Sequence, residues 1–110
     1  MQHLNTHLYQ RSLELIDVTK AVLDQLPTGY GFLADQLRKA SSSVVLNFSE
    51  GGGRRTAKER RRFFEIARAS SHEVAAIFDV AMGFGVIDAG THETGKELCD
   101  RVSAMLYRFR

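Results

Sequence analysis

The residues best suited to chemistry form one basic run, Arg-Arg-Thr-Ala-Lys-Glu-Arg-Arg-Arg, at residues 54–62. The run holds six basic residues and one acidic residue, a net charge of +5, whereas the rest of the chain carries −3. Eleven of the fifteen basic residues of the chain are arginines, whose planar guanidinium groups suit phosphates and carboxylates. The run is therefore a candidate site for a polyanion. The side chains expected to carry it are Arg54, Arg55, Lys58, Arg61 and Arg62.

The position of this run at the start of a helix favours the same interpretation but leaves an alternative open. Cations in the first turns of a helix oppose its macrodipole, each at about 0.3 to 1 kcal/mol when exposed, so something should offset them. RNA or DNA is one candidate, and because no aromatic residue interleaves with the run, binding should be directed at the phosphate backbone with little sequence preference. The alternative is a solvated surface that Glu50, Glu59 and Glu65 neutralise locally, with Arg61 and Glu65 at i, i+4 spacing.

Other reactive residue types lack the partners that catalytic and metal sites require. The glycines at 51–53 are not followed by Gly-Lys-Ser/Thr, which argues against a nucleotide phosphate loop. His3 and His7 share a helix face but have no carboxylate or cysteine set near them in sequence, and Cys99 has no base beside it. We therefore predict no catalytic residue, no metal and no cofactor, and hence a protein that is not an enzyme.

Four helical segments must position these residues. Apolar residues recur at spacings of three and four, the helical period, in the segments 5–26, 32–50, 56–83 and 88–109. The connections are short, and the chain contains one proline, Pro27. Short connections place consecutive helices antiparallel. The expected fold is all-α, an antiparallel up-down-up-down four-helix bundle that occupies residues 1–110 as one domain.

Local signals mark where these helices begin and end. Thr56 and Glu59 match a capping box, in which the Thr56 hydroxyl accepts a hydrogen bond from the Glu59 amide. Asp88 is the expected N-cap of the fourth helix. The glycines at 51–53 are expected to end the second helix in the left-handed conformation. Gly95 weakens the first half of the fourth helix by about 1 kcal/mol relative to alanine.

The first helix has more apolar surface than a bundle helix needs. Its apolar residues cover an arc of roughly 200°, whereas packing on one side of a small bundle requires little more than ~100°. The excess predicts a contact with a second copy of the chain. The residues expected in this oligomer interface are Tyr9, Leu13, Ile16 and Leu23.

Length and composition bound the setting in which the chain works. Of its 110 residues, 44% are hydrophobic and 25% are charged, which is typical of a globular domain. No apolar run approaches the ~20 residues of a membrane span, no signal peptide is recognisable, and the single cysteine cannot form an internal disulfide. We expect a cytoplasmic protein without a membrane partner.

Three stretches of the sequence resemble a known family. They are Gln-Leu-Arg-Lys-Ala at 36–40, Asn-Phe-Ser-Glu-Gly at 47–51, and Phe-Phe-Glu-Ile-Ala-Arg-Ala-Ser-Ser-His-Glu at 63–73. Over residues 30–82 the chain resembles the bacterial four-helix-bundle family that includes proteins encoded in intervening sequences of large-subunit ribosomal RNA genes. That family is similar to the accessory variability protein of diversity-generating retroelements. The chain differs from the family pattern in Phe48-Ser49, where Ile-Ala is usual.

The resemblance implies a non-enzymatic bundle that assembles into a ring-like homo-oligomer, with pentamers in the family. In the retroelement branch it also implies binding to nucleic acid and to a reverse transcriptase. Carried over by position, the polar motif residues are Arg38, Asn47, Glu50 and Glu73.

We expect these four motif residues to be structural, because a buried polar group left unpaired costs about 1 to 3 kcal/mol. Arg38 should pair with Glu73, whereas Asn47 and Glu50 should cap or bridge the turn toward Thr56. The alternative is that Glu50 and Glu73 form a carboxylate pair that binds a metal or acts as acid and base.

Two functions remain open from the sequence. The first is a structural or scaffold module, a homo-oligomer that presents a surface to other macromolecules. The second is a nucleic-acid-binding accessory factor, in which symmetry repeats the basic run of residues 54–62 and adds avidity. The expected partners are accordingly other copies of the chain, RNA or DNA, and a protein.

Overall fold

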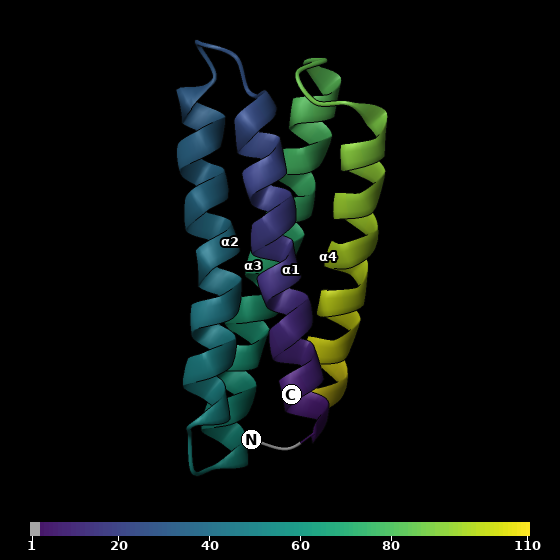
Figure 1. Ribbon diagram of the computed structural model, residues 1–110. Coiled ribbons are helices and arrows are strands. Elements are labelled where there is room, and N and C mark those ends of the chain that lie inside the picture. Colours follow the sequence, from purple (N-terminus) through teal and green to yellow (C-terminus); the bar gives the residue numbers. More distant parts are fainter. Residues whose placement is uncertain (1–2) are drawn as a thin grey trace.

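The computed structural model describes residues 3–110, with side chains from residue 6 onward, and in this range it contains four helices and no strand. The helices are α1 (His3–Gln25), α2 (Gly31–Gly52), α3 (Ala57–Gly83) and α4 (Ala89–Phe109). Their connections lie alternately at the two ends of the molecule (Figure 1). The prediction of an all-α chain with four helices is confirmed, and the helix bounds lie within a few residues of the predicted ones.

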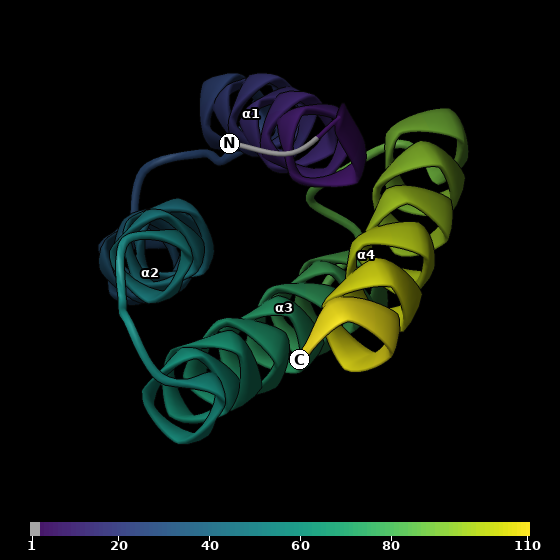
Figure 2. The same cartoon turned by 90° about the horizontal axis from the view of Figure 1, so that it is seen from below.

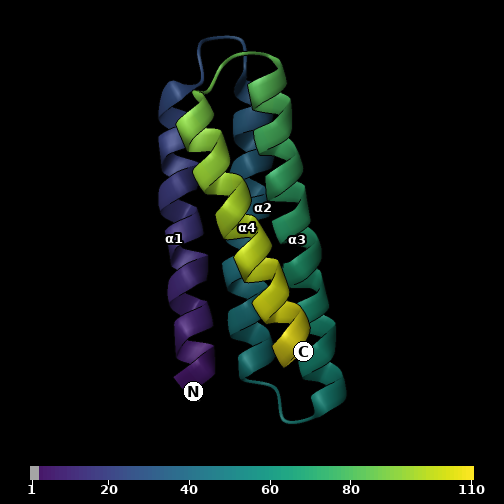
Figure 3. The same cartoon turned by 90° about the vertical axis from the view of Figure 1, so that its right-hand side faces the viewer.

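The helices form a ring in which each packs on its neighbours in sequence and α4 closes against α1 (Figure 2). The α2–α3 and α1–α4 pairs therefore lie on opposite sides of the bundle. The molecule measures 44 × 22 × 17 Å. α4 runs obliquely, beside α1 where it begins and beside α3 where it ends (Figure 3).

One apolar core runs through the bundle, and all four helices contribute to it at spacings of three and four. The largest fully buried side chains are Phe48, Phe64 and Phe78. The ring centres of Phe48 and Phe64 lie 5.3 Å apart and join α2 to α3. Fully burying a side chain of this size contributes about 1.5 to 3 kcal/mol, so packing rather than helix propensity dominates the stability of these helices.

The two predicted helix N-caps are confirmed. The Glu59 amide donates to the Thr56 hydroxyl at 3.1 Å, and the Thr91 amide donates to an Asp88 carboxylate oxygen at 2.7 Å. Gln25, the last residue of α1, adds two long-range contacts through its side chain. Its Oε1 accepts from the Asp88 backbone amide at 2.8 Å, and its Nε2 donates to the Thr91 hydroxyl at 2.9 Å. The start of α4 is thereby tied to the end of α1.

The expectation of a left-handed helix end at residues 51–53 is wrong. α2 continues through Gly52, and Gly53 has a φ of −91°. Among the described residues, positive φ occurs only at Gly29 (100°) and Gly85 (71°), where the two loops at the other end of the bundle turn. Gly51 serves close packing instead, because a Cβ there would lie 2.8 Å from Cδ1 of Phe64.

Small residues also allow α3 and α4 to pack closely. The Ser103 hydroxyl donates to the Ser71 hydroxyl at 3.0 Å, and the Ser71 hydroxyl donates to the backbone oxygen of Cys99 at 3.2 Å. Gly95 faces Phe78, and a Cβ at position 95 would lie 2.6 Å from Cε2 of the Phe78 ring. The helix-propensity cost of Gly95 is therefore offset by the burial of an aromatic ring.

Candidate functional site

Charge is divided between the two ends of the bundle. When each helix is split at its middle, the half that contains the α2–α3 turn holds eleven Arg and Lys and five Asp and Glu, a net charge of +6. The other half holds four basic and eight acidic residues, a net charge of −4. Ten of the eleven arginines lie in the first half, which is termed the basic end below (lower end in Figure 1).

The five side chains predicted to bind a polyanion all lie at the basic end, in different surroundings. Arg54 forms an ion pair with Glu50, and its guanidinium carbon lies 4.8 Å from the centre of the Phe63 ring. The guanidinium carbon of Arg62 lies 5.4 Å from the same ring centre. The remaining three side chains are exposed to solvent: Arg55, Lys58 and Arg61.

Local carboxylates neutralise the run only in part. Glu50 pairs with Arg54, but Glu65 pairs with Arg110, at 3.0 Å, and not with Arg61. The pair between Arg61 and Glu65 that the alternative interpretation included does not form, since Glu65 pairs with Arg110 at the end of α4. Among the side chains of residues 6–110, Arg54 is the one member of the run that forms an ion pair.

Sequence reasoning missed a second group of residues at the basic end. The guanidinium carbons of Arg68 and Arg110 lie 4.9 Å and 4.2 Å from the centre of the Tyr107 ring, which is 52% exposed. Aromatic rings therefore do lie beside cations of the basic end in the fold, although none interleaves with the run in the sequence. Phe63 directly follows the run and gave a signal in the sequence, whereas Tyr107 belongs to α4 and only the tertiary fold places it here.

The expected pair between Arg38 and Glu73 is also wrong. Arg38 contacts Asp35 on its own helix, with 3.4 Å between Nη1 and Oδ1, and both side chains are exposed. Successive residues of a helix point about 100° apart. As a result it is Lys39, and not Arg38, that borders α3 near Glu73.

Asn47 makes a local contact rather than the expected bridge. Its Nδ2 donates to the backbone oxygen of Ser43 at 2.9 Å and to the Ser43 hydroxyl at 3.0 Å. The Ser43 hydroxyl in turn lies 2.8 Å from the Ser70 hydroxyl, so the motif joins α2 to α3. At the turn, Glu50 forms an ion pair with Arg54 and the Thr56 hydroxyl accepts from the Glu59 amide, so each has a partner other than the expected one.

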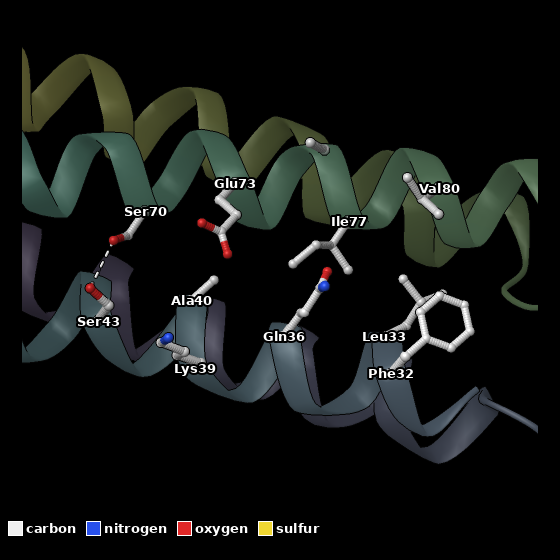
Figure 4. Close-up of a pocket in the computed structure, with 11 residues that line it drawn as sticks. Phe32, Leu33, Gln36, Lys39, Ala40, Ser43, Ser70, Glu73, Ile77 and Val80 are labelled. Atoms are coloured by element: carbon white, nitrogen blue, oxygen red, sulfur yellow. Dashed lines mark hydrogen bonds between the residues drawn. The ribbon is translucent and has the colours of Figure 1, made fainter. Parts of the chain in front are cut away.

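A groove of about 750 Å³ follows α2 and α3 from the Ser43–Ser70 hydrogen bond away from the basic end of the bundle (Figure 4). Lys39 projects from α2 and Glu73 from α3 near the middle of the groove. Neither forms an ion pair within residues 6–110. Because Glu50 lies at the α2–α3 turn and Glu73 in this groove, the two do not make the carboxylate pair considered above.

The groove ends at an exposed aromatic cluster. Phe32 and Phe84 are 52% and 56% exposed, and their ring centres lie 6.5 Å apart. Tyr30 contacts both, with ring centres 6.0 Å and 5.6 Å away. Rings that contact one another and remain open to solvent are typical of a surface that another macromolecule covers.

The four α1 residues predicted to form an oligomer interface differ in exposure. Tyr9 and Leu23 pack against the core of their own chain, and Ile16 is half-buried. Leu13 is 41% exposed. Their role in an interface stays a prediction, in which Leu13 offers the most accessible surface.

Among the described residues, no group of three or more His, Cys, Asp or Glu could hold a metal ion. In the same part of the chain, no helix is both long and apolar enough to cross a membrane. Cys99 is buried, and its burial raises the pKa of the thiol to about 12, so the sulfur is protonated at neutral pH.

Comparisons with known proteins agree with this architecture. The model of the family described as 23S rRNA-intervening sequence protein matches residues 5–108. A crystal structure from Bacteroides thetaiotaomicron, described as a protein with unknown function from the S23 ribosomal protein family, is similar with a TM-score of 0.82 and 13% identity, covering 92% of this chain and 95% of that one. No curated protein matches the chain. Because the family match spans nearly the whole sequence, the chain belongs to the 23S rRNA-intervening sequence protein family.

Proposed function

We propose that this chain is a non-enzymatic scaffold, an antiparallel up-down-up-down four-helix bundle that associates with copies of itself and presents a surface to other macromolecules. The assembly is a ring-like homo-oligomer, with five subunits as the resemblance implies. The observation that carries the proposal is the number of large apolar side chains left in solvent. Among the side chains of residues 6–110, eight of them are between 37% and 66% exposed.

Exposure on this scale is costly for a monomer and is removed by association. Burying apolar surface is favourable by roughly 25 cal/mol per Å². Monomeric proteins of this size rarely leave a contiguous apolar patch larger than a few hundred Å². A ring also repeats every other surface of the subunit, including the basic end, so that weak contacts to a partner add in avidity.

The proposal is tested by the molar mass of the purified protein in solution. Light scattering during size-exclusion chromatography should give a multiple of 12.3 kDa at micromolar concentration. A mass of one subunit under the same conditions would contradict it.

A second candidate function is supported by the division of charge between the two ends. The basic end carries +6, and five of its cations are exposed without an ion pair among residues 6–110: Arg55, Lys58, Arg61, Arg62 and Arg108. Such a surface suits the phosphate backbone of RNA or DNA. In this role the chain is a nucleic-acid-binding accessory factor.

Binding to labelled single- and double-stranded RNA and DNA over a salt series tests this role. Each phosphate contact adds about 0.7 to 0.9 to the slope of log affinity against log salt. Arg61→Ala with Arg62→Ala should therefore lower the slope by about 1.4 to 1.8. Lys20→Ala with Arg38→Ala removes the same charge from the other end and should leave binding unchanged. Equal losses in both double variants, or no binding at low salt, would refute the role.

A further inference from the structure

The face formed by α2 and α3 is apolar at both ends and charged in the middle. Five of the eight exposed large apolar residues lie along it, on α2 or on or directly after α3: Phe32, Leu46, Ile66, Val80 and Phe84. Positions 32, 39 and 46 on α2 are spaced by heptads, and so are positions 66, 73 and 80 on α3. The three positions of each set therefore lie on one side of their helix. Lys39 and Glu73 occupy the middle positions.

This face is also basic. The hollow on the outer side of α3, next to the groove, is lined by Ile66 and by the side chains of Lys58, Arg61, Arg62 and Glu65. Taken with Lys39 and Glu73 in the groove itself, the two hollows contain four cations and two carboxylates, a net charge of +2. A macromolecule that covers the whole face therefore fits best if it brings apolar surface and an excess of negative charge.

The α1–α4 face, on the opposite side of the bundle, has the complementary properties. Two adjoining hollows of about 370 Å³ and 480 Å³ share Asp17, Val18 and Thr94. Their floor is apolar or small, with Val18, Ala21, Leu98 and Gly90. Their charged lining has four carboxylates and one cation, a net charge of −3: Glu14, Asp17, Asp88, Glu97 and Arg101.

We propose that the α2–α3 face of one copy of this chain docks on the α1–α4 face of a second copy. The inference rests on the proposed self-association and adds to it the two surfaces that meet. Apolar side chains of the α2–α3 face enter the hollows beside Val18, and the cations around Ile66 meet the carboxylates of α1 and α4. A bundle side of 44 by 22 Å is large enough for the roughly 800 Å² per partner that a specific interface buries.

This geometry restricts the form of the assembly. Two different faces meet, so the contact is heterologous, and a pair of subunits keeps one free face of each kind. When the rotation between successive subunits closes, repeating the contact gives a ring that leaves no unpaired face, which is the form of the proposed assembly. A contact in which the α2–α3 face met itself would instead stop at a dimer.

Two double variants test the contact, each made at exposed positions so that the fold is retained. Leu46→Glu with Val80→Glu places charge on the apolar α2–α3 face. Asp17→Lys with Glu97→Lys reverses the charge of the α1–α4 face. Asp24→Lys with Asp35→Lys makes the same charge change at exposed carboxylates that line none of these hollows, and serves as the control. Circular dichroism verifies that all three remain helical.

Light scattering should show the wild type and the control as the same oligomer and each face variant as a monomer. Mixing the two face variants in equal amounts should give a complex of two chains, because one intact face of each kind remains in the mixture. If the face variants keep the wild-type mass, or if only the α2–α3 variant dissociates, the docking proposal is overturned although self-association stands. A monomeric wild type would overturn both.

Discussion

The contact between Gly51 and Phe64 gives a sharp test of the packing between α2 and α3. A Cβ at position 51 would lie 2.8 Å from Cδ1 and 2.9 Å from Cε1 of Phe64, and 2.9 Å from Cβ of Phe63. A Cβ at the adjacent Gly52 would meet nothing within 4 Å. Both glycines have helical backbone with negative φ, so alanine introduces no backbone strain at either position.

The difference between Gly51→Ala and Gly52→Ala isolates the cost of overpacking. Both substitutions gain helix propensity, at most about 1 kcal/mol. Gly51→Ala alone also pushes the fully buried Phe64 ring, and overpacking of this kind costs typically about 1 to 3 kcal/mol. For 110 residues, an unfolding entropy of about 2.1 cal/mol/K per residue makes 1 kcal/mol equal to roughly 4 °C. The Gly51→Ala variant should therefore melt roughly 4 to 13 °C below the Gly52→Ala variant.

Thermal unfolding followed by circular dichroism at 222 nm measures both melting temperatures. Guanidinium unfolding should reproduce the same difference in the free energy of unfolding. Equal melting temperatures for the two variants, or a higher one for Gly51→Ala, would refute the conclusion that Gly51 is present for close helix packing.

Three further predictions concern titratable groups. Burial raises the pKa of the Cys99 thiol to about 12. A thiol reagent at pH 8 should therefore react with Cys99 only as fast as the protein unfolds. The free energy of unfolding should decrease as pH rises above about 9, because the thiol ionises there in the unfolded chain but not in the folded one. Hydrogen bonds from Lys96 and, next, from His92 lower the pKa of Asp79. These bonds therefore stabilise the folded protein above pH 3.8, and the stabilisation is lost as pH falls through the lowered pKa. In urea unfolding between pH 5 and 2, the free energy of unfolding should fall less in Asp79→Asn than in the wild type. The pKa of Asp88 is lowered by hydrogen bonds from the backbone and side chain of Thr91. Asp88→Ala should therefore speed hydrogen exchange of the Thr91 amide, whereas Asp88→Asn, which can still cap the helix, should not.

The helices could be predicted from the sequence because the signals that define them are local. Apolar spacing, the Thr56 capping box and the Asp88 N-cap each depend on residues within a few positions of one another, and all appear in the structure. The end of α2 was misjudged because Gly51 is compatible with two explanations. Only the position of Phe64, on another helix, identifies it as a packing residue.

The surface sites were harder to predict because they depend on rotation and pairing between helices. Arg38 and Lys39 are adjacent in sequence, yet only Lys39 borders the groove with Glu73. Similarly, the partner of Glu65 is Arg110, which lies 45 residues away and reaches the basic end only because α4 returns to it. Contacts of this kind leave no periodic signal in a single sequence.

The most direct test of the account is the molar mass of the wild-type protein across a dilution series into the low micromolar range, in buffer of physiological ionic strength. We expect a constant mass equal to a whole-number multiple of 12.3 kDa, consistent with a closed ring whose subunits each use two faces. A mass of 12.3 kDa throughout would contradict the account, because the exposed apolar residues of α2 and α3 would then have no second copy to cover them.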